Sequence, residues 1–238
     1  MKERSSAYKI ALSALMAALA NLLGIFAVPG PWNIKFGMTG IPILITSFAL
    51  GPFWGALCGL LGGITQALNY GSIWYVIYTA IQGCVAGLFV RHYKSIKWWS
   101  LIMGFLGGFF LILWVDLLRQ GPQTFQELTS PNAPKIFGLN IIFGFPIFAI
   151  ISGIVVAIIA FLLSSKVKEM NFFHLTLAGC FGAIAYVPYD AIILYYIQLY
   201  PWIPTWFVLS KDLVQDFFAA ILCAWIYQNA RISKALSR

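Results

Sequence analysis

The chain has 238 residues, of which 61% are hydrophobic and 9% are charged, and its formal net charge is +8. Soluble domains are about half apolar and about a quarter charged, so these few charges cannot form a water-exposed surface. The composition therefore excludes a soluble protein and predicts a polytopic α-helical membrane protein. The basic residues cluster in short connections between apolar runs, where they act as topology signals, so the net charge does not indicate nucleic-acid binding.

Apolar runs recur along the whole chain. Most are close to the roughly 20 residues that cross a hydrocarbon core about 30 Å thick, and helices satisfy their own backbone hydrogen bonds in lipid. The runs cover residues 8–28, 39–51, 53–69, 73–90, 98–118, 136–163, 173–196 and 206–227. We therefore expect an all-α membrane helix bundle of about eight helical segments, forming a single transmembrane domain over residues 1–238.

The dipeptide Gly51-Pro52 decides the number of segments. Gly-Pro marks a turn and proline disfavours a continuing helix, so we predict two short helices here rather than one broken helix. With eight segments and a cytoplasmic N-terminus, the basic loops at Arg91 and Lys166 fall inside, as the positive-inside rule favours. Seven segments would put later basic loops outside. The predicted location is the plasma membrane, multi-pass, with both termini cytoplasmic.

Charged residues within the apolar runs are few and costly, which makes them candidates for function. Asp116 lies near the outer end of the fifth run, Asp190 within the seventh, and Asp212 and Asp216 near the start of the eighth. Pro188 is expected to loosen the helix before Asp190. One interpretation is a polar pocket that opens outward, and the other is snorkelling or structural pairing. We favour function for Asp190 and keep both interpretations for the other three.

Polar and aromatic residues of the external connections complete the predicted pocket. Such a pocket would stack a ring on Trp or Tyr, form hydrogen bonds through Asn33, and match charge through acidic and basic groups. The predicted substrate-binding residues are Trp32, Asn33, Lys35, Tyr186, Asp190 and Lys211. Trp and Tyr are also ordinary anchors at the membrane interface, so an aromatic belt stays an alternative for them. Asn69, Gln82 and Gln215 are neutral polar groups that usually bond to another helix.

The sequence contains no catalytic or nucleotide-binding motif. No HExxH, no Ser–His–Asp arrangement and no GxxxxGK[ST] loop is present, and the four cysteines lack metal-ligand spacing. We therefore expect a protein that is not an enzyme and uses no cofactor or metal. Any ATP-driven activity would require a partner.

The first run carries small residues four positions apart, and such residues let helix backbones approach closely. The pairs are Ala7 with Ala11, Ser13 with Ala17, and Ala14 with Ala18. The contact they make is either internal or with another protein.

Three stretches carry a family resemblance. They are ALSALMAALA over residues 11–20, KFGMTGIPILITSFALGPFWG over 35–55, and AYVPYD over 185–190 together with KDLVQD over 211–216. The chain resembles a substrate-binding S component of an energy-coupling factor (ECF) vitamin transporter, and its middle stretch is most similar to the riboflavin-type members. The resemblance implies a six-helix core, to which the hairpin at residues 98–163 is an addition.

The resemblance also implies a function. S components bind a vitamin in an outward pocket, and a membrane coupling subunit with two cytoplasmic ATPases drives uptake. Ala14 and Ala18 match the small-residue face that meets the coupling subunit. The alternative is a self-sufficient secondary transporter with Asp190 and Asp116 as coupling carboxylates, which inverted repeats would support. No such repeats are visible.

Overall fold

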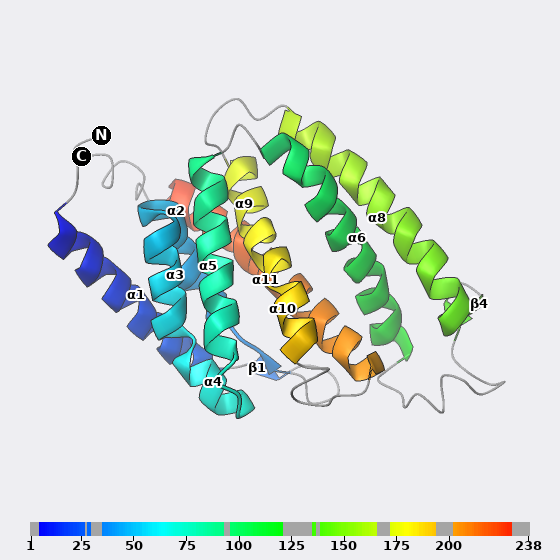
Figure 1. Ribbon diagram of the computed structural model, residues 1–238, viewed down its shortest axis with the longest axis horizontal. Helices are drawn as coiled ribbons and strands as arrows, with labels where there is room; N and C mark the ends of the chain where they lie inside the picture. Colours follow the sequence, from blue (N-terminus) through cyan, green and yellow to red (C-terminus); the bar gives the residue numbers. More distant parts are fainter. Residues whose placement is uncertain are drawn as a thin grey trace. The chain divides into compact units, whose positions relative to one another are not determined.

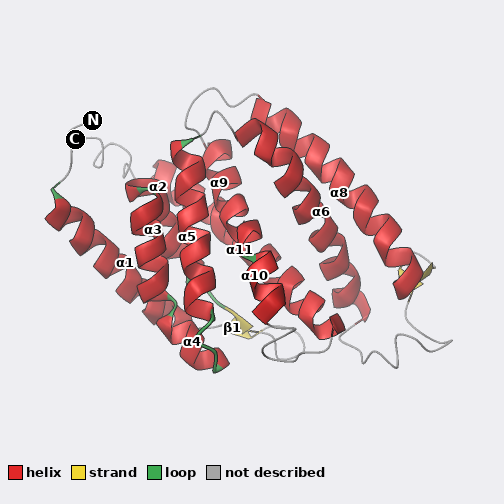
Figure 2. Cartoon of the chain, in the orientation of Figure 1, coloured by secondary structure: helices red, strands yellow, loops and turns green. Residues whose placement is uncertain are grey.

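The computed structural model of the chain describes residues 5–26, 28–29, 35–92, 96–120, 135–136, 139–165, 172–193 and 202–229. Its helices are α1 (Ser6–Ile25), α2 (Gly40–Leu50), α3 (Pro52–Gly62), α4 (Ile64–Tyr70), α5 (Tyr75–Arg91), α6 (Ile96–Gln120), α8 (Ile141–Ser165), α9 (Phe172–Ala185), α10 (Val187–Ile192) and α11 (Trp202–Asn229). Two antiparallel strand pairs join β1 (Val28–Pro29) to β2 (Lys35–Phe36), and β3 (Lys135–Ile136) to β4 (Leu139–Asn140). The fold is an all-α membrane helix bundle (Figure 2).

The eight predicted segments are confirmed, and two of them are each divided into two helices. Gly63 separates α3 from α4, and Tyr186 separates α9 from α10. Pro188 lies in the first turn of α10, where its missing N–H group is tolerated. The predicted loosening of the helix before Asp190 is therefore present as a break after Ala185.

The Gly51-Pro52 turn separates α2 from α3, as predicted. Gly51 has a φ of 91°, which side chains rarely adopt, and a Cβ at this position would collide with the guanidinium group of Arg91. Pro52 begins α3. Arg91 Nη2 donates a 3.0 Å hydrogen bond to the carbonyl oxygen of Leu50, one of the carbonyls that the end of α2 leaves unpaired. This contact fixes the turn against the last turn of α5.

Membrane-spanning character is visible in the described residues. Three stretches are long and apolar enough to cross a bilayer, namely Ser6–Ile25, Ile147–Ser165 and Phe172–Asp190. Shorter apolar helices cover Gly40–Leu50, Tyr75–Arg91 and Trp98–Phe109. Large apolar side chains such as Leu15, Ile154 and Trp225 are exposed, as expected where a helix faces lipid. The chain is a membrane protein.

The chain divides into two compact units. Unit 1 comprises Met1–Ile96, Lys166–Tyr186 and Gln215–Arg238, and unit 2 comprises Lys97–Ser165 and Val187–Val214. Unit 1 thus contains α1, α2, α3 with α4, α5, α9 and the second half of α11, which are four whole predicted segments and one part of each of the last two. The predicted extra hairpin lies in unit 2. The expectation of a single transmembrane domain stays a prediction.

Close helix contacts at glycines hold unit 1 together. α3 lies side by side with α5 (Figure 1), where a Cβ on Gly55 would lie 2.6 Å from the carbonyl oxygen of Gly83. A Cβ on Gly62 would lie 2.7 Å from the Cβ of Ala20 in α1. Lipid tails are as apolar as the helices, so membrane helices associate through such close packing and through hydrogen bonds between helices.

Hydrogen bonds from two asparagines tie α1 to the α3–α4 segment. Asn21 Nδ2 donates to the carbonyl of Leu61 at 2.7 Å, and Asn21 Oδ1 accepts from the backbone N–H of Thr65 at 2.8 Å. Asn69 Nδ2 donates to the carbonyl of Gly24 at 2.9 Å. The prediction that Asn69 bonds another helix is confirmed.

An apolar core joins α2, α5, α9 and the second half of α11 within unit 1. Its buried residues include Leu44, Phe48, Ala86, Val90, Leu175, Ala178, Ala220, Cys223 and Ala224. Phe48 and Tyr227 meet edge to face, with ring centroids 6.1 Å apart. Cys58 and Cys223 are buried with free thiols, as is usual for cysteines that pack as small apolar residues.

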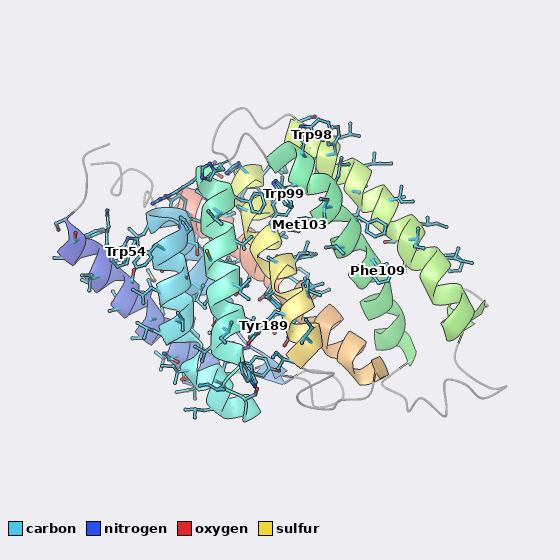
Figure 3. All side chains as sticks on the ribbon, in the orientation of Figure 1. Trp54, Trp98, Trp99, Met103, Phe109 and Tyr189 are labelled. Atoms are coloured by element: carbon cyan, nitrogen blue, oxygen red, sulfur yellow. The ribbon has the colours of Figure 1, made fainter. Side chains whose placement is uncertain are left out.

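Unit 2 contains the predicted hairpin of α6 and α8. The Ser100 and Ser164 hydroxyls lie 2.9 Å apart near one end, and Ser152 Oγ donates to the carbonyl of Gly108 at 2.8 Å farther along. The two helices are therefore antiparallel. Aromatic and sulfur-containing side chains follow α6 (Figure 3), among them Trp98, Trp99, Met103 and Phe109.

Candidate functional site

Five buried polar side chains meet in the interior of unit 1, and we call them the polar cluster. They are Gln66 of α4, Tyr78 and Gln82 of α5, Tyr186 after α9, and Asp216 of α11. None of the five is more than 8% exposed. Helices from distant parts of the chain supply them, so only the folded bundle brings them together.

Contacts run through the cluster from one member to the next. The amide of Gln66 donates a hydrogen bond to the Tyr78 hydroxyl. The rings of Tyr78 and Tyr186 pack with centroids 4.6 Å apart, and the Tyr186 hydroxyl donates to Asp216 Oδ2 at 3.0 Å. Tyr75 extends the aromatic row, with its ring centroid 5.3 Å from that of Tyr78. Tyr75, Tyr78 and Tyr186 thus form a row of packed rings, which we call the tyrosine platform. The row ends at the carboxylate of Asp216.

Gly40, the first residue of α2, connects Gln82 to this platform. A Cβ at Gly40 would lie 3.4 Å from Asp216 Oδ1 and 3.4 Å from Gln82 Nε2. The carboxylate and the amide therefore converge over a backbone position that has no side chain. The N-terminus of α2 carries partial positive charge, which favours a carboxylate beside it.

The cluster lies deep within the bundle. α2 has 11 residues and rises about 16 Å, whereas α5 has 17 residues and rises about 25 Å. The C-terminus of α2 is fixed at Arg91, the last residue of α5, so α2 begins beside the middle of α5, where Gln82 lies. The non-helical backbone before Gly40 thus lies about 16 Å, the length of α2, from the C-terminal end of α5.

Irregular backbone at membrane depth occurs only where protein buries it or where it lines a cavity, and in transporters it forms substrate sites. Here the backbone N–H of Gly37 donates to Gln215 Oε1 at 3.0 Å, so one polar group of the irregular backbone before α2 has a partner. Gln215 was expected to bond another helix, and its partner is instead the non-helical backbone between β2 and α2.

Three polar atoms in this region have no hydrogen-bond partner within the part of the chain that the structure describes. They are Thr39 Oγ1, Gln66 Oε1 and Gln82 Nε2. Thr39 is 3% exposed and Gln82 is 1% exposed. A buried polar group without a partner costs about 1–3 kcal/mol. Such groups are kept in native proteins where a ligand or water supplies the partner.

The functional groups of the polar cluster are those of Gln66, Tyr78, Gln82, Tyr186 and Asp216. They offer hydrogen-bond donors and acceptors, aromatic faces and one carboxylate. Within the described residues, no group of three or more His, Cys, Asp or Glu side chains could hold a metal ion. The arrangement can orient a polar molecule with an aromatic ring.

The structure places two of the six predicted substrate-binding side chains, Tyr186 and Asp190, and these lie in different units. Tyr186 is fully buried within the polar cluster. Asp190 is 4% exposed and belongs to α10 in unit 2. Trp32 and Asn33 lie outside the described residues. Lys35 in β2 and Lys211 in α11 have described backbones, but their side chains lie outside the description, as does that of Asp116.

Sequence reasoning assigned less weight to the residues that form most of the cluster. Asp216 was left open between function and structure, and Gln82 was expected to bond another helix, whereas its Nε2 has no partner among the described residues. Gln66 and Tyr78 were not singled out. The available signal was a glutamine or tyrosine within an apolar run, because a polar side chain in lipid needs a partner.

The small residues of α1 separate onto different faces. Ser13, Ala17, Ala20 and Gly24 are buried, and Ala17 and Ala20 pack against Gly62 of α3. Ala14 and Ala18 are exposed. The internal contact therefore uses the Ser13–Ala17 pair, and the Ala14–Ala18 pair is left on the outer surface of unit 1.

One comparison with known proteins gives a match. A family model described as 5TMR of 5TMR-LYT matches residues 1–126, which is more than half of the 238-residue chain. The match covers all of unit 1 up to Ile96, including Gln66, Tyr78 and Gln82, and continues through α6. No curated protein and no solved structure matches the chain.

Proposed function

We propose that this chain, which belongs to the 5TMR of 5TMR-LYT membrane family, is a ligand-binding membrane protein whose site is the polar cluster of unit 1. In this proposal it is the substrate-binding subunit of an ECF-type importer. It captures a vitamin or a related ring-containing molecule from outside the cell. A separate coupling subunit and two ATPases then drive uptake.

The observation that carries the proposal is the set of unpaired polar atoms beside the tyrosine platform. Thr39 Oγ1, Gln66 Oε1 and Gln82 Nε2 are buried without partners among the described residues. A bound polar molecule would supply the missing hydrogen bonds and would lower the cost of burying these groups. The rings of Tyr78 and Tyr186 would pack against its ring.

Two further features support an S-component role. Unit 1 holds four of the six segments that the resemblance implies in full and one part of each of the last two, and the extra hairpin lies in unit 2. Ala14 and Ala18 are exposed on α1, so they are accessible to the small-residue contact with a coupling subunit. We also propose that the protein lies in the plasma membrane with both termini in the cytoplasm. Protease accessibility of tags on the two termini in sealed cells would test this orientation.

The secondary-transporter alternative has one observation in its favour. Asp190 is a carboxylate that is 4% exposed in α10, and intramembrane carboxylates serve as proton relays in transporters. In that case uptake into vesicles would follow an imposed proton gradient without ATP.

The test is a comparison of binding and uptake. The purified full chain is screened by thermal shift against vitamins, nucleobases and their precursors, and hits are then assayed for uptake into proteoliposomes. Binding by the chain alone, with uptake only when a coupling subunit and ATPases are added, is expected. Gradient-driven uptake by the chain alone would favour the transporter, and absence of any binding would defeat both.

A further inference from the structure

The side chain of Asn21 in α1 takes part in the backbone hydrogen bonding of the segment formed by α3 and α4. Its Nδ2 donates to the carbonyl of Leu61 at 2.7 Å, and its Oδ1 accepts from the backbone N–H of Thr65 at 2.8 Å. The two backbone groups are four residues apart, so an unbroken α-helix would bond them to each other. One side-chain amide is therefore inserted into the hydrogen-bond ladder between α3 and α4.

We infer that this inserted amide is a conformational switch. With Asn21 in place, α3 and α4 are separate helices, because a side chain inserted into the ladder breaks and bends a helix. When Asn21 withdraws, the carbonyl of Leu61 bonds the N–H of Thr65, and α3 and α4 become one straight helix. Asn21 is thus a positioning residue for Gln66 in the polar cluster, and its bearing on ligand binding rests on the proposed function.

Both states give these polar groups a partner. Asn21 Nδ2 also lies 3.1 Å from the carbonyl of Ala17, one turn earlier in α1, so the withdrawn amide keeps a hydrogen bond within its own helix. Gly63, between α3 and α4, is already right-handed, with a φ of −80° and a ψ of −4°. The joined helix over residues 52–70 would rise about 28 Å, close to the hydrocarbon thickness of about 30 Å, whereas α3 alone rises about 16 Å.

The change between the two states moves α4 rather than α3. α3 is fixed against α5, where Thr79 Oγ1 donates to the carbonyl of Gly59 at 2.8 Å and a Cβ on Gly63 would collide with the same hydroxyl. α4 ends at Gly71, whose φ of 65° is the left-handed conformation of a turn, and the side chain of Leu68 is 76% exposed. A glycine at each end and an exposed outer face let α4 swing as a short rigid helix.

Gln66 carries the movement of α4 into the polar cluster. It directly follows Thr65, and its amide donates to the hydroxyl of Tyr78, whose ring packs against that of Tyr186. Tyr78 belongs to α5 and stays with α3, so straightening draws Gln66 away from Tyr78. Because Asn21 belongs to α1, a displacement of α1 from α3 acts on the cluster through this one amide.

The first experiment measures the bend by disulfide formation in the detergent-purified full chain. A Cβ on Gly24 of α1 would lie 3.4 Å from the Cβ of Thr65, close to the separation of about 3.5–4.5 Å in disulfides. The double variant Gly24→Cys with Thr65→Cys is oxidised, and peptide mapping follows the bridge. We expect Asn21→Leu in this background to slow bridge formation about tenfold or more, because the two positions separate when α4 swings.

Asn69→Leu is the matched control. Asn69 Nδ2 donates to the carbonyl of Gly24 at 2.9 Å, so this variant removes another hydrogen bond between α1 and α4 and leaves the inserted amide of Asn21 in place. We expect its rate of bridge formation to stay within about twofold of the parent double variant. Asn21→Ala repeats the measurement without added bulk between α1 and α4, should Asn21→Leu fail to fold.

The second experiment separates straightening from simple loosening. Hydrogen exchange of the Thr65 amide is measured at single-residue resolution in the folded, monodisperse fraction of the wild-type chain, Asn21→Leu and Asn21→Ala. We expect the rate to stay within about threefold, because the carbonyl of Leu61 replaces Asn21 as the partner. A purely structural role for Asn21 would leave this amide without a partner and speed its exchange about tenfold or more.

Three results overturn the inference. They are unchanged bridge formation in the Asn21 variants, an equal fall in Asn69→Leu, and fast exchange of the Thr65 amide in the Asn21 variants. Neither measurement uses a ligand, so each of these results leaves the proposed function intact. Absence of binding across the vitamin panel would overturn the proposed function and leave the switch itself standing.

Discussion

The hydroxyl of Tyr186 donates a 3.0 Å hydrogen bond to Oδ2 of Asp216, and so joins the end of α9 to the middle of α11. Both residues are buried, with Tyr186 at 0% and Asp216 at 5% exposure. Hydrogen bonds to a charged group contribute about 1.5–3 kcal/mol, roughly twice a neutral bond. This bond fixes the carboxylate beside Gly40, the first residue of α2.

Removal of this hydrogen bond should weaken the bundle. Tyr186→Phe keeps the ring that packs on Tyr78 and loses the hydroxyl, so we expect the free energy of unfolding to fall by about 1–3 kcal/mol. Chemical unfolding in detergent would measure the change. A double-mutant cycle with Asp216→Leu should give a coupling energy near 1 kcal/mol or more. Strict additivity of the two single changes would contradict the role of this bond.

The contact between α3 and α5 should tolerate no side chain at Gly83. A Cβ there collides with the carbonyl of Gly55, and a backbone atom cannot move aside as a flexible side chain can. We expect Gly83→Ala to cost about 1–3 kcal/mol, measured as a lower unfolding midpoint. Gly71→Asn is the matched control, because Gly71 has a φ of 65° that asparagine tolerates and no atom lies within 4 Å of its Cβ position. Equal losses in the two variants would argue against the close contact.

Larger side chains on the two faces of α1 should affect different properties of the protein. Ala14→Leu with Ala18→Leu changes an exposed face, so we expect binding and stability to be unchanged while ATP-driven uptake is lost. Ala17→Leu with Ala20→Leu forces bulk against Gly62 and should lower the free energy of unfolding by about 1–3 kcal/mol. The readouts are ligand affinity, unfolding midpoint and uptake. Normal uptake in the Ala14 and Ala18 variant would contradict the partner-contact proposal.

The Gly51 turn should depend on the guanidinium of Arg91. Arg91→Met keeps an apolar chain of similar length and removes the donor to the Leu50 carbonyl. We expect an unfolding cost of about 1 kcal/mol, because one capping hydrogen bond is lost at a helix end. Arg91→Lys should recover part of this loss through a single donor. A midpoint that does not change in Arg91→Met would show that Pro52 and Gly51 are sufficient for the turn.

The sequence predicted the segments well because their signals are local. Apolar length, Gly51-Pro52 and Pro188 each act on their own stretch of chain, and the structure has breaks at or next to these positions. The site was harder to predict, because Gln66, Gln82 and Asp216 come from three helices and meet only through tertiary packing. The split of α3 from α4 at Gly63 was also missed, since a glycine within a helix is usually tolerated.

The sequence favoured a functional role for Asp190 over Asp216, whereas the structure places Asp216 in the polar cluster. Pro188 made the neighbourhood of Asp190 look irregular, and irregular backbone is a signal for sites in membrane proteins. The irregular backbone beside the polar cluster lies instead before Gly40, where α2 begins beside the middle of α5, and it carries the unpaired hydroxyl of Thr39. The length of α2, which has 11 residues, was the clue in the sequence, because a helix that short cannot cross the bilayer alone.

The most direct measurement is native mass spectrometry of the full chain beside its Gly40→Ala variant. The added Cβ would make only ordinary 3.4 Å contacts with Asp216 and Gln82, so the fold should persist, yet it would occupy the point where the two side chains converge. A small molecule that co-purifies with the wild-type chain and is depleted from Gly40→Ala is the predicted result. A bound molecule retained equally in both proteins, or a wild-type chain that neither carries nor binds one, would contradict binding at the polar cluster.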